Sequence, residues 1–193
     1  MRFLPLFGLL MLTTTVFAAD LGKPHVIGAP ADTQIYVFSS PSCPHCATYH
    51  RAILPTLQEA ARAGRAQIRL VSMPGDPRSL KAATIAACLP ETAYIPYMER
   101  VFNNQAYWLS GKDPTLMLTG YARASGADEA ALTACLSDTN LATAIQTTGR
   151  TLGRLYQISG LPTTVVIRAG SHQSFIGADP RILPQIEALL PHD

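Results

Sequence analysis

The chain has 193 residues, of which 48% are hydrophobic and 15% charged, and its formal net charge is +2. This composition is typical of one globular domain rather than a disordered chain, and the length suffices for a sizeable core without help from metals or disulfides. Because the sequence has no basic run or stripe, it lacks the electrostatic signature of a nucleic-acid-binding protein, and we expect no nucleic-acid partner.

The N-terminal residues have the layout of a secretory signal peptide. Arg2 supplies a positive charge, residues 3–12 form an apolar run, and residues 16–18 (Val-Phe-Ala) place small or aliphatic side chains at the positions that a signal peptidase reads. An uncleaved membrane anchor is the alternative, but the run is about half the ~20 apolar residues that a span requires. We therefore expect a signal peptide at residues 1–18, a periplasmic mature domain over residues 19–193 and no later membrane span.

The next part of the chain predicts a strand, a helix and a second strand. Residues 34–39 are rich in β-branched and aromatic side chains, which favours a strand, and residues 25–28 are compatible with a short edge strand. Apolar residues at helical spacing predict a helix over residues 43–63, kinked at Pro55 because proline has no N–H to donate. Alternation over residues 66–73 predicts a second strand, parallel to the first through a right-handed crossover.

The middle of the chain, residues 78–157, has no convincing strand pattern. It contains short Ala-rich stretches with apolar residues at helical spacing, each bounded by Pro, Gly or Asp. About eighty residues are too many for a loop, so we expect a helical lobe. The expected helices cover residues 79–89, 93–103, 114–124, 128–136 and 141–156.

The C-terminal part predicts an antiparallel hairpin followed by a helix. Residues 163–168 give the clearest strand pattern in the chain, and residues 172–176 form the returning strand after a tight turn. Asp179 and Pro180 have the character of an N-cap and a first helical residue, and open a helix that ends near Leu190. The expected fold is α/β, with a mixed sheet that has helices on both faces. Its core covers about residues 25–75 and 158–193, and the inserted lobe covers about residues 77–157.

The motif Cys43-Pro44-His45-Cys46 lies where the first strand ends and the first long helix begins. The unpaired N–H groups and the dipole of that helix end stabilise a thiolate at Cys43, and a protonated or donating His45 adds to this effect. Cys46 follows one helical turn later, close enough to form a disulfide with Cys43. A stabilised thiolate favours the reduced protein and makes the disulfide form a stronger oxidant. We therefore expect Cys43 to be the exposed nucleophile and Cys46 the buried resolving thiol.

Metal binding is the alternative function for these cysteines. His50 follows Cys46 by four residues and offers a third ligand. A structural zinc site usually has four ligands, however, and neither Cys88 nor Cys135 belongs to a second C-x-x-C motif. We therefore expect neither a metal nor an organic cofactor, and we expect both His50 and His25 to lie in contact with solvent.

Cys88 and Cys135 both fall in the predicted helical lobe. An even number of cysteines behind a signal peptide indicates an oxidising compartment, so we expect a structural disulfide between these two. The alternative is a pair of buried free cysteines that act as small hydrophobic residues.

Two segments resemble a known family. Residues 38–46 (Phe-Ser-Ser-Pro-Ser-Cys-Pro-His-Cys), followed by a helix, are similar to the DsbA family of bacterial thiol–disulfide oxidoreductases in the thioredoxin superfamily. Residues 160–166 (Gly-Leu-Pro-Thr-Thr-Val-Val) resemble the superfamily segment that carries a cis proline, and residues 113–136 resemble the helical insertion of the family. The similarity extends from about residue 28 to residue 190, and implies a thioredoxin-like fold with an inserted helical lobe.

The resemblance also implies roles for individual residues. Pro162 would be cis and face the redox pair, and Leu161 would offer its backbone N–H and C=O to an extended substrate. An ordinary trans proline at a strand start is the alternative for Pro162. Family members usually carry a buried acid six positions before the nucleophile, where this chain has Val37. The proton path to Cys46 must therefore use water or another group.

The function that follows is disulfide donation to newly exported, reduced or unfolded proteins, with reoxidation by a membrane quinone-linked partner as the family resemblance implies. The alternatives are a disulfide isomerase or reductase, a maturation factor dedicated to one client, and a metal-binding thioredoxin-like carrier. Long isomerases of the superfamily have an additional N-terminal dimerisation domain. Only about fifteen residues separate the expected cleavage site from the first firm strand, so we expect a monomer.

Overall fold

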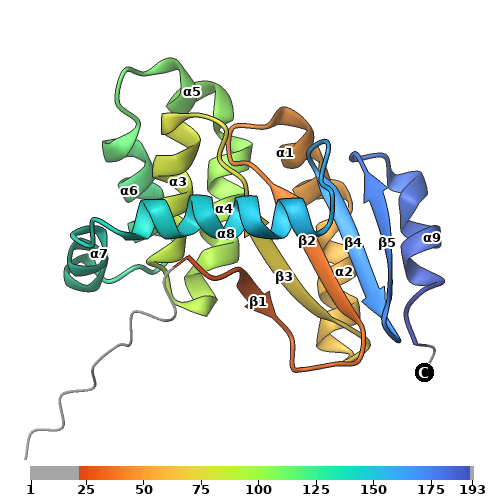
Figure 1. Ribbon diagram of the computed structural model, residues 1–193. Coiled ribbons are helices and arrows are strands. Elements are labelled where there is room, and N and C mark those ends of the chain that lie inside the picture. The colour runs from red at the N-terminus through yellow and green to blue at the C-terminus, as the bar shows by residue number, and fades with distance from the viewer. Residues whose placement is uncertain (1–21, 192–193) are drawn as a thin grey trace, which may run out of the picture.

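A five-stranded mixed sheet forms the centre of the computed structural model, which describes residues 22–191 (Figure 1). The predicted signal peptide lies outside the described residues. The strands are β1 (His25–Ile27), β2 (Gln34–Ser39), β3 (Gln67–Ser72), β4 (Thr163–Arg168) and β5 (Ser171–Ile176), in the order β1-β3-β2-β4-β5. β2 and β3 are parallel, and the other neighbours are antiparallel. The predicted mixed α/β sheet is confirmed, including the short edge strand.

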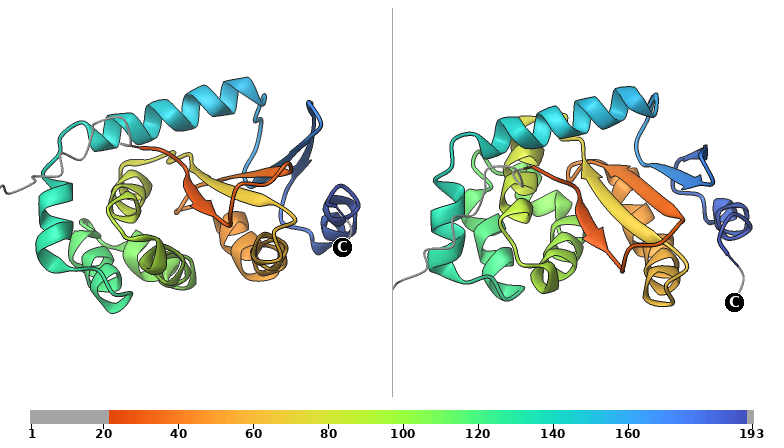
Figure 2. Two further views of the ribbon diagram at one scale, coloured as in Figure 1. Left: turned by 90° about the horizontal axis from the view of Figure 1, so that it is seen from below. Right: turned by 60° about the horizontal axis from the view of Figure 1, so that its bottom comes forward.

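The two faces of β2 contact different layers of helices. Its fully buried Ile35 and Val37 belong to the main core, which includes residues of the two helices that follow β2. Its Phe38 points the other way, into a smaller cluster with Val71 and Val165. Figure 2 shows the resulting layers, with α8 (Leu141–Leu155) across one face of the sheet and the α1–α2 pair across the other. The alternation of side chains along a strand thus buries both faces of this central element.

The single kinked helix predicted for residues 43–63 is instead two helices. α1 covers Pro44–Ala52 and α2 covers Leu54–Arg62, with Ile53 as the shared cap. Pro55 lies in the first turn of α2, where its missing N–H is tolerated. The proline therefore starts a new helix, where we had expected it to bend an existing one.

The helices between β3 and β4 form a lobe at one end of the sheet (Figure 1). Besides α8 they are α3 (Pro77–Ala87), α4 (Glu91–Asn103), α5 (Gln105–Ser110), α6 (Thr115–Ala124) and α7 (Glu129–Leu136). The short helix α5 was not predicted, because six residues are too few to show a helical period. Its Trp108 is buried and donates its indole N–H to the Val101 carbonyl at 2.8 Å, which holds α5 against α4. A disulfide joins Cys88, at the end of α3, to Cys135 in α7.

The C-terminal part follows the predicted hairpin but not the predicted helix. Ala169 and Gly170 both have positive φ, of 50° and 78°, which suits the tight turn between β4 and β5. Beyond Asp179, which accepts a hydrogen bond from the Arg181 N–H, a 3-10 turn (Pro180–Ile182) precedes the short α9 (Leu183–Glu187). The expected continuous helix is interrupted because Pro184 again occupies the first turn of a new helix.

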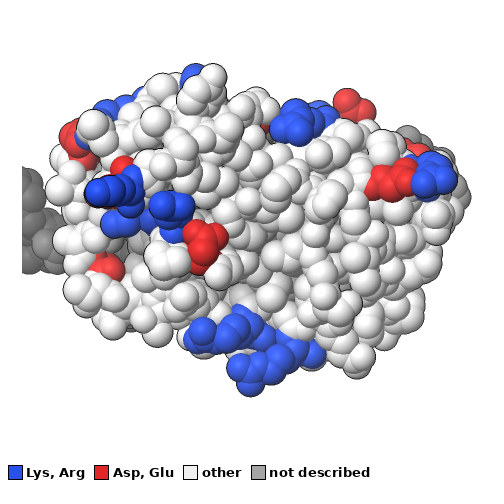
Figure 3. All heavy atoms as spheres, turned by 90° about the horizontal axis from the view of Figure 1, so that it is seen from above, with Lys and Arg blue, Asp and Glu red and all other residues white. Residues whose placement is uncertain are grey.

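Charged side chains on the face of the molecule seen in Figure 3 form small separate groups with wide uncharged areas between them. This distribution agrees with the low net charge. Across residues 22–191, no helix combines the length and the apolar character that a membrane crossing requires.

Candidate redox site

Cys43 is the N-cap residue of α1. It follows the turn after β2, where its backbone N–H donates to the Ser40 carbonyl at 3.0 Å. Its Sγ accepts a hydrogen bond from the Cys46 backbone N–H at 3.2 Å. Pro44 occupies the first helical position, where its missing N–H leaves no donor unpaired. The helix end thus directs one of its free N–H groups at the Cys43 sulfur, which stabilises a negative charge there.

The two thiols of the motif have different surroundings. Both are free cysteines; Cys43 is half-buried and Cys46 is fully buried. Burial raises the pKa of the Cys46 thiol well above its ordinary value, its hydrogen bond with Cys43 raises it further, and the Ser40 backbone opposes both effects. Attack from solvent therefore reaches Cys43, while Cys46 favours its protonated form. His45 and Pro44, between them, are exposed.

The Leu161–Pro162 peptide bond is cis and brings its loop to the redox pair. The Cys43 thiol faces the Leu161 carbonyl oxygen at 3.8 Å, although 118 positions separate the two residues. The Pro162 carbonyl accepts the Gly177 N–H at 2.8 Å, which ties the loop to the segment after β5. Within the part of the chain that the structure describes, the Leu161 N–H has no hydrogen-bond partner. The loop thus offers a free backbone donor beside the nucleophile.

The position of the missing acid, Val37, is fully buried and is paired with Thr164 across β2 and β4. The Thr164 hydroxyl lies 2.5 Å from the Tyr49 hydroxyl, and both side chains are fully buried. Burial raises the pKa of Tyr49, and the hydrogen bond with Thr164 lowers it in part. Tyr49 lies one helical turn after Cys46, so a pair of neutral hydroxyls is buried next to this position. The sequence analysis did not identify this pair. Two features could have indicated it: Thr164 follows the cis proline by two residues, and Tyr49 lies on the same face of the helix as Cys46.

Two side chains of the helical lobe hold the turn that carries Cys43. Gln105 in α5 donates both N–H groups of its side-chain amide, to the Pro41 carbonyl at 2.8 Å and to the Cys43 carbonyl at 3.1 Å. Ser42 donates to the carboxylate of Asp76, the N-cap of α3, at 2.6 Å. Burial alone would raise the pKa of Asp76, but hydrogen bonds from Ser42 and the start of α3 lower it. The sequence analysis missed Gln105 because it missed α5.

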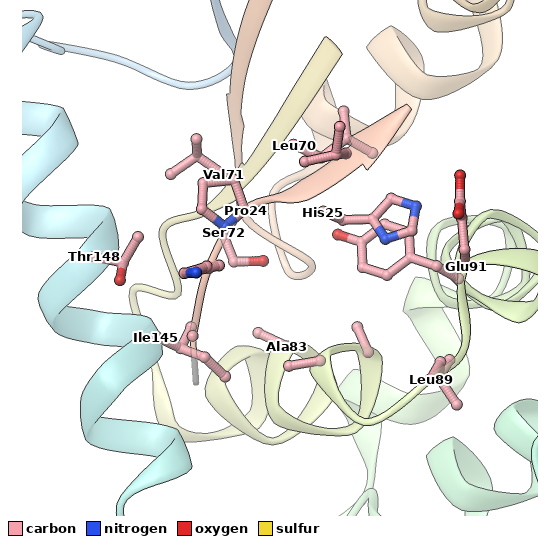
Figure 4. Close-up of a pocket in the computed structure, with 16 residues that line it drawn as sticks. Pro24, His25, Leu70, Val71, Ser72, Ala83, Leu89, Glu91, Ile145 and Thr148 are labelled. Carbon is pink, nitrogen blue, oxygen red and sulfur yellow. The ribbon is translucent and has the colours of Figure 1, made fainter. Parts of the chain in front are cut away.

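Two histidines differ from expectation. His50 is only partly exposed: its imidazole packs on Phe102 with ring centroids 4.2 Å apart, its Nε2 is buried without a partner among the described residues, and burial lowers its pKa to about 3. His25 stacks on Tyr94 at 3.7 Å beside a cavity between β1, α3 and α8 (Figure 4), and burial lowers its pKa to about 4. Both side chains are therefore more buried than we expected for surface residues, because edge strand β1 and helix α1 are covered by α4 of the lobe. Within residues 22–191, no three or more His, Cys, Asp or Glu side chains gather as a metal site would require.

Comparison with known proteins gives a family and a set of similar folds. The sequence matches the thioredoxin family over residues 20–170. Alpha-DsbA1 from Wolbachia pipientis has a similar structure, with a TM-score of 0.74 at 21% identity, covering 86% of this chain and 90% of that chain. A protein-disulfide isomerase from Novosphingobium aromaticivorans gives 0.69 at 22% identity, over 87% and 97% of the two chains. DsbA from Chlamydia trachomatis gives 0.65 at 20% identity, over 96% and 98%. No curated protein matches the sequence.

Proposed function

Because this chain belongs to the thioredoxin family and has a DsbA-like fold with an inserted helical lobe, we propose that it is an exported thiol–disulfide oxidoreductase that donates disulfides to secreted proteins. The observation that carries the proposal is the placement of Cys43. Its sulfur accepts an N–H from the start of α1 and lies beside the free backbone of the cis-proline loop, while Cys46 is buried one turn away.

The proposed reaction starts from the oxidised protein, with a disulfide between Cys43 and Cys46. A client thiolate attacks the Cys43 sulfur, the bond to Cys46 breaks, and the Cys46 sulfur leaves with the electron pair and takes up a proton, as its raised pKa favours. A second client thiolate then attacks the client sulfur of the mixed disulfide. Cys43 leaves as a thiolate, which the Cys46 N–H and the helix dipole stabilise. The client gains one disulfide, and the protein gains two electrons.

In this reaction Leu161 and Pro162 bind the client. An extended segment that reaches Cys43 can pair with the free Leu161 N–H and with its carbonyl group, as in strand addition. The catalytic group comprises Cys43 and Cys46, with Pro44 and His45 setting the surroundings of the sulfur. Exposed apolar residues on the lobe that also supplies Gln105, among them Tyr107 and Leu116, suit unfolded clients.

We further propose that residues 1–18 direct export to the periplasm, that the mature domain acts as a monomer, and that a membrane quinone-linked partner restores the disulfide. The cis-proline loop and the half-buried Cys43 supply a place where both a client and this partner can exchange disulfides. Neither reaction requires a bound cofactor.

The equilibrium redox potential of the Cys43–Cys46 pair tests the proposal. Oxidised and reduced protein are equilibrated in glutathione buffers and separated after alkylation. The potential of a disulfide donor should lie closer to that of DsbA, about −120 mV, than to that of thioredoxin, about −270 mV. A value near that of thioredoxin would assign a reductase, and stoichiometric metal in the purified protein would assign a carrier. Rapid reshuffling of scrambled disulfides without net oxidation would assign an isomerase.

A further inference from the structure

We propose that a groove beside the cis-proline loop, edged by Arg150 and Arg154, selects client segments that carry an acidic residue close to the reacting cysteine. The inference rests on the proposed function and adds a substrate preference to it. We call this feature the arginine groove. It is defined by Met73, Pro74, Gly75, Gly149, Arg150, Gly153, Arg154, Ile158 and Leu161.

The arginine groove begins at Leu161, the neighbour of the nucleophile. It consists of two hollows of about 270 and 470 Å³, which share Met73 and Arg150. The smaller hollow is bounded by Leu161, whose carbonyl oxygen is 3.8 Å from the Cys43 sulfur. The larger one continues past Arg154 to Ile158. A client segment that pairs with Leu161 therefore has an open path along α8.

Two glycines of α8 set the shape of this path. A Cβ atom at Gly149 would lie 2.5 Å from the Ser72 carbonyl oxygen, and one at Gly153 would lie 2.9 Å from the Met73 side chain. Only glycine allows α8 to rest this closely on the end of β3. The next residue after each glycine is an arginine, and both arginines line the groove together with Met73.

The positive charges of the two arginines are available to a bound segment. They are exposed and four residues apart, which places them on one side of α8. Among residues 22–191, neither is paired with a carboxylate, and the one hydrogen bond of Arg150 is to the Thr147 hydroxyl at 3.4 Å. The Asp76 carboxylate next to Gly75 is already engaged by Ser42 and by the start of α3. Figure 3 shows a group of basic side chains, with no acidic ones beside it, along the edge that α8 forms.

The groove therefore combines an apolar floor with two cations that have no carboxylate partner among the described residues. The floor is formed by Met73, Ile158 and Leu161, which suits the apolar side chains of an unfolded segment. A guanidinium binds a carboxylate through paired hydrogen bonds, so Asp or Glu is the side chain that fits the edge. An extended segment advances about 3.3 Å per residue. An acidic residue two or three positions from the client cysteine, roughly 7–10 Å away, would reach the arginines.

The test compares matched peptides. Each peptide has two cysteines and differs only at the positions two and three residues from the first cysteine, which carry either Asp or Asn. Oxidation by the disulfide form of the protein is followed in single turnover, at low and at high salt. The native protein should oxidise the Asp peptide about three- to tenfold faster than the Asn peptide at low salt, and high salt should reduce this ratio.

The double substitution Arg150→Gln/Arg154→Gln should bring the Asp-to-Asn ratio close to one. Its matched control, Arg62→Gln/Arg168→Gln, removes the same charge at the opposite end of the sheet and should keep the native ratio. A native ratio of one, or a ratio that survives the substitution of Arg150 and Arg154, would overturn the inference while leaving disulfide donation intact. Equal peptide rates together with binding to anionic vesicles that needs these arginines would assign the surface to lipid. Failure to oxidise either peptide would instead overturn the proposed function.

Discussion

At the scale of single residues, His50 packs the redox helix α1 against the lobe. Its burial makes the free energy of unfolding depend on pH. Its imidazole is packed against Phe102, and its Nε2 has no hydrogen-bond partner. The folded protein must keep this group neutral, because burial lowers its pKa from 6.5 to about 3. The unfolded chain can protonate it at any pH below about 6.5.

We therefore predict that the free energy of unfolding falls as the pH is lowered from about 6.5 towards 3. In that range the unfolded state binds a proton that the folded state does not, so acid favours unfolding. Between pH 6.5 and 4.5, His50 should account for about 2 kcal/mol of this loss. Urea titrations of the native protein and of His50→Phe measure it. The phenylalanine variant should lose less stability on acidification, and the part that remains should come mainly from His25, whose pKa is also lowered.

An unchanged pH dependence in His50→Phe would show that this histidine is protonated in the folded protein. Measurements stay above pH 4.5 because Asp76 and Asp179 have lowered pKa values and begin to contribute in stronger acid. The substitution His172→Phe serves as the control, since His172 is exposed in β5.

The residues of the redox motif were the easiest part of the site to predict from sequence. Cys43 and Cys46 combine a known spacing with a position between a strand and a helix, and the Gly-Leu-Pro-Thr segment marks the loop that faces them. Partners that come from distant segments left no such signal. Gln105 donates to the Cys43 carbonyl from a helix too short to show a period, and Tyr49 meets Thr164 across the core. A contact that only the assembled fold creates cannot be found from local spacing.

At the scale of elements, prolines and glycines set where helices end and how closely they pack. Pro55 and Pro184 each begin a new helix where the apolar pattern alone predicted one continuous helix. Every strand end was predicted to within one residue, because each strand is a short run bounded by turn residues. The apolar period detects the face that a helix buries, but it continues across a break when both helices bury the same face.

The close approach of α8 to β3 gives a prediction at this scale. Gly149→Ala should lower the free energy of unfolding by about 1–3 kcal/mol, because the added Cβ would meet the Ser72 carbonyl oxygen and push the helix outward. Gly120→Ala in α6 is the matched control, since nothing lies within 4 Å of its added Cβ. That variant should be about 0.5–1 kcal/mol more stable than the native protein, because alanine favours a helix. Chemical unfolding of both variants measures these changes in the free energy of unfolding. If the two variants were equally stable, the close packing described for α8 would be contradicted.

At the scale of the whole molecule, one covalent link closes the helical lobe on itself. The disulfide between Cys88 and Cys135 joins positions 47 residues apart. In the chain-entropy account, a loop of this length stabilises the folded state by about 4 kcal/mol. The double substitution Cys88→Ala/Cys135→Ala should therefore lower the free energy of unfolding by roughly that amount.

This substitution should leave Cys43 reactive, since neither removed sulfur touches the redox pair. Urea unfolding measures the loss of stability, and labelling of Cys43 under native conditions measures its reactivity. A native disulfide that can be removed with no loss of stability would mean that the lobe is held by its packing alone.

The turn that carries Cys43 is held from three sides, by Gln105, by Asp76 through Ser42, and by the loop at Leu161. These contacts join parts of the chain that are synthesised at different times, and the last of them is made more than a hundred residues after the cysteine. The surroundings of Cys43 are therefore complete only after the segment at Leu161 has folded against the turn.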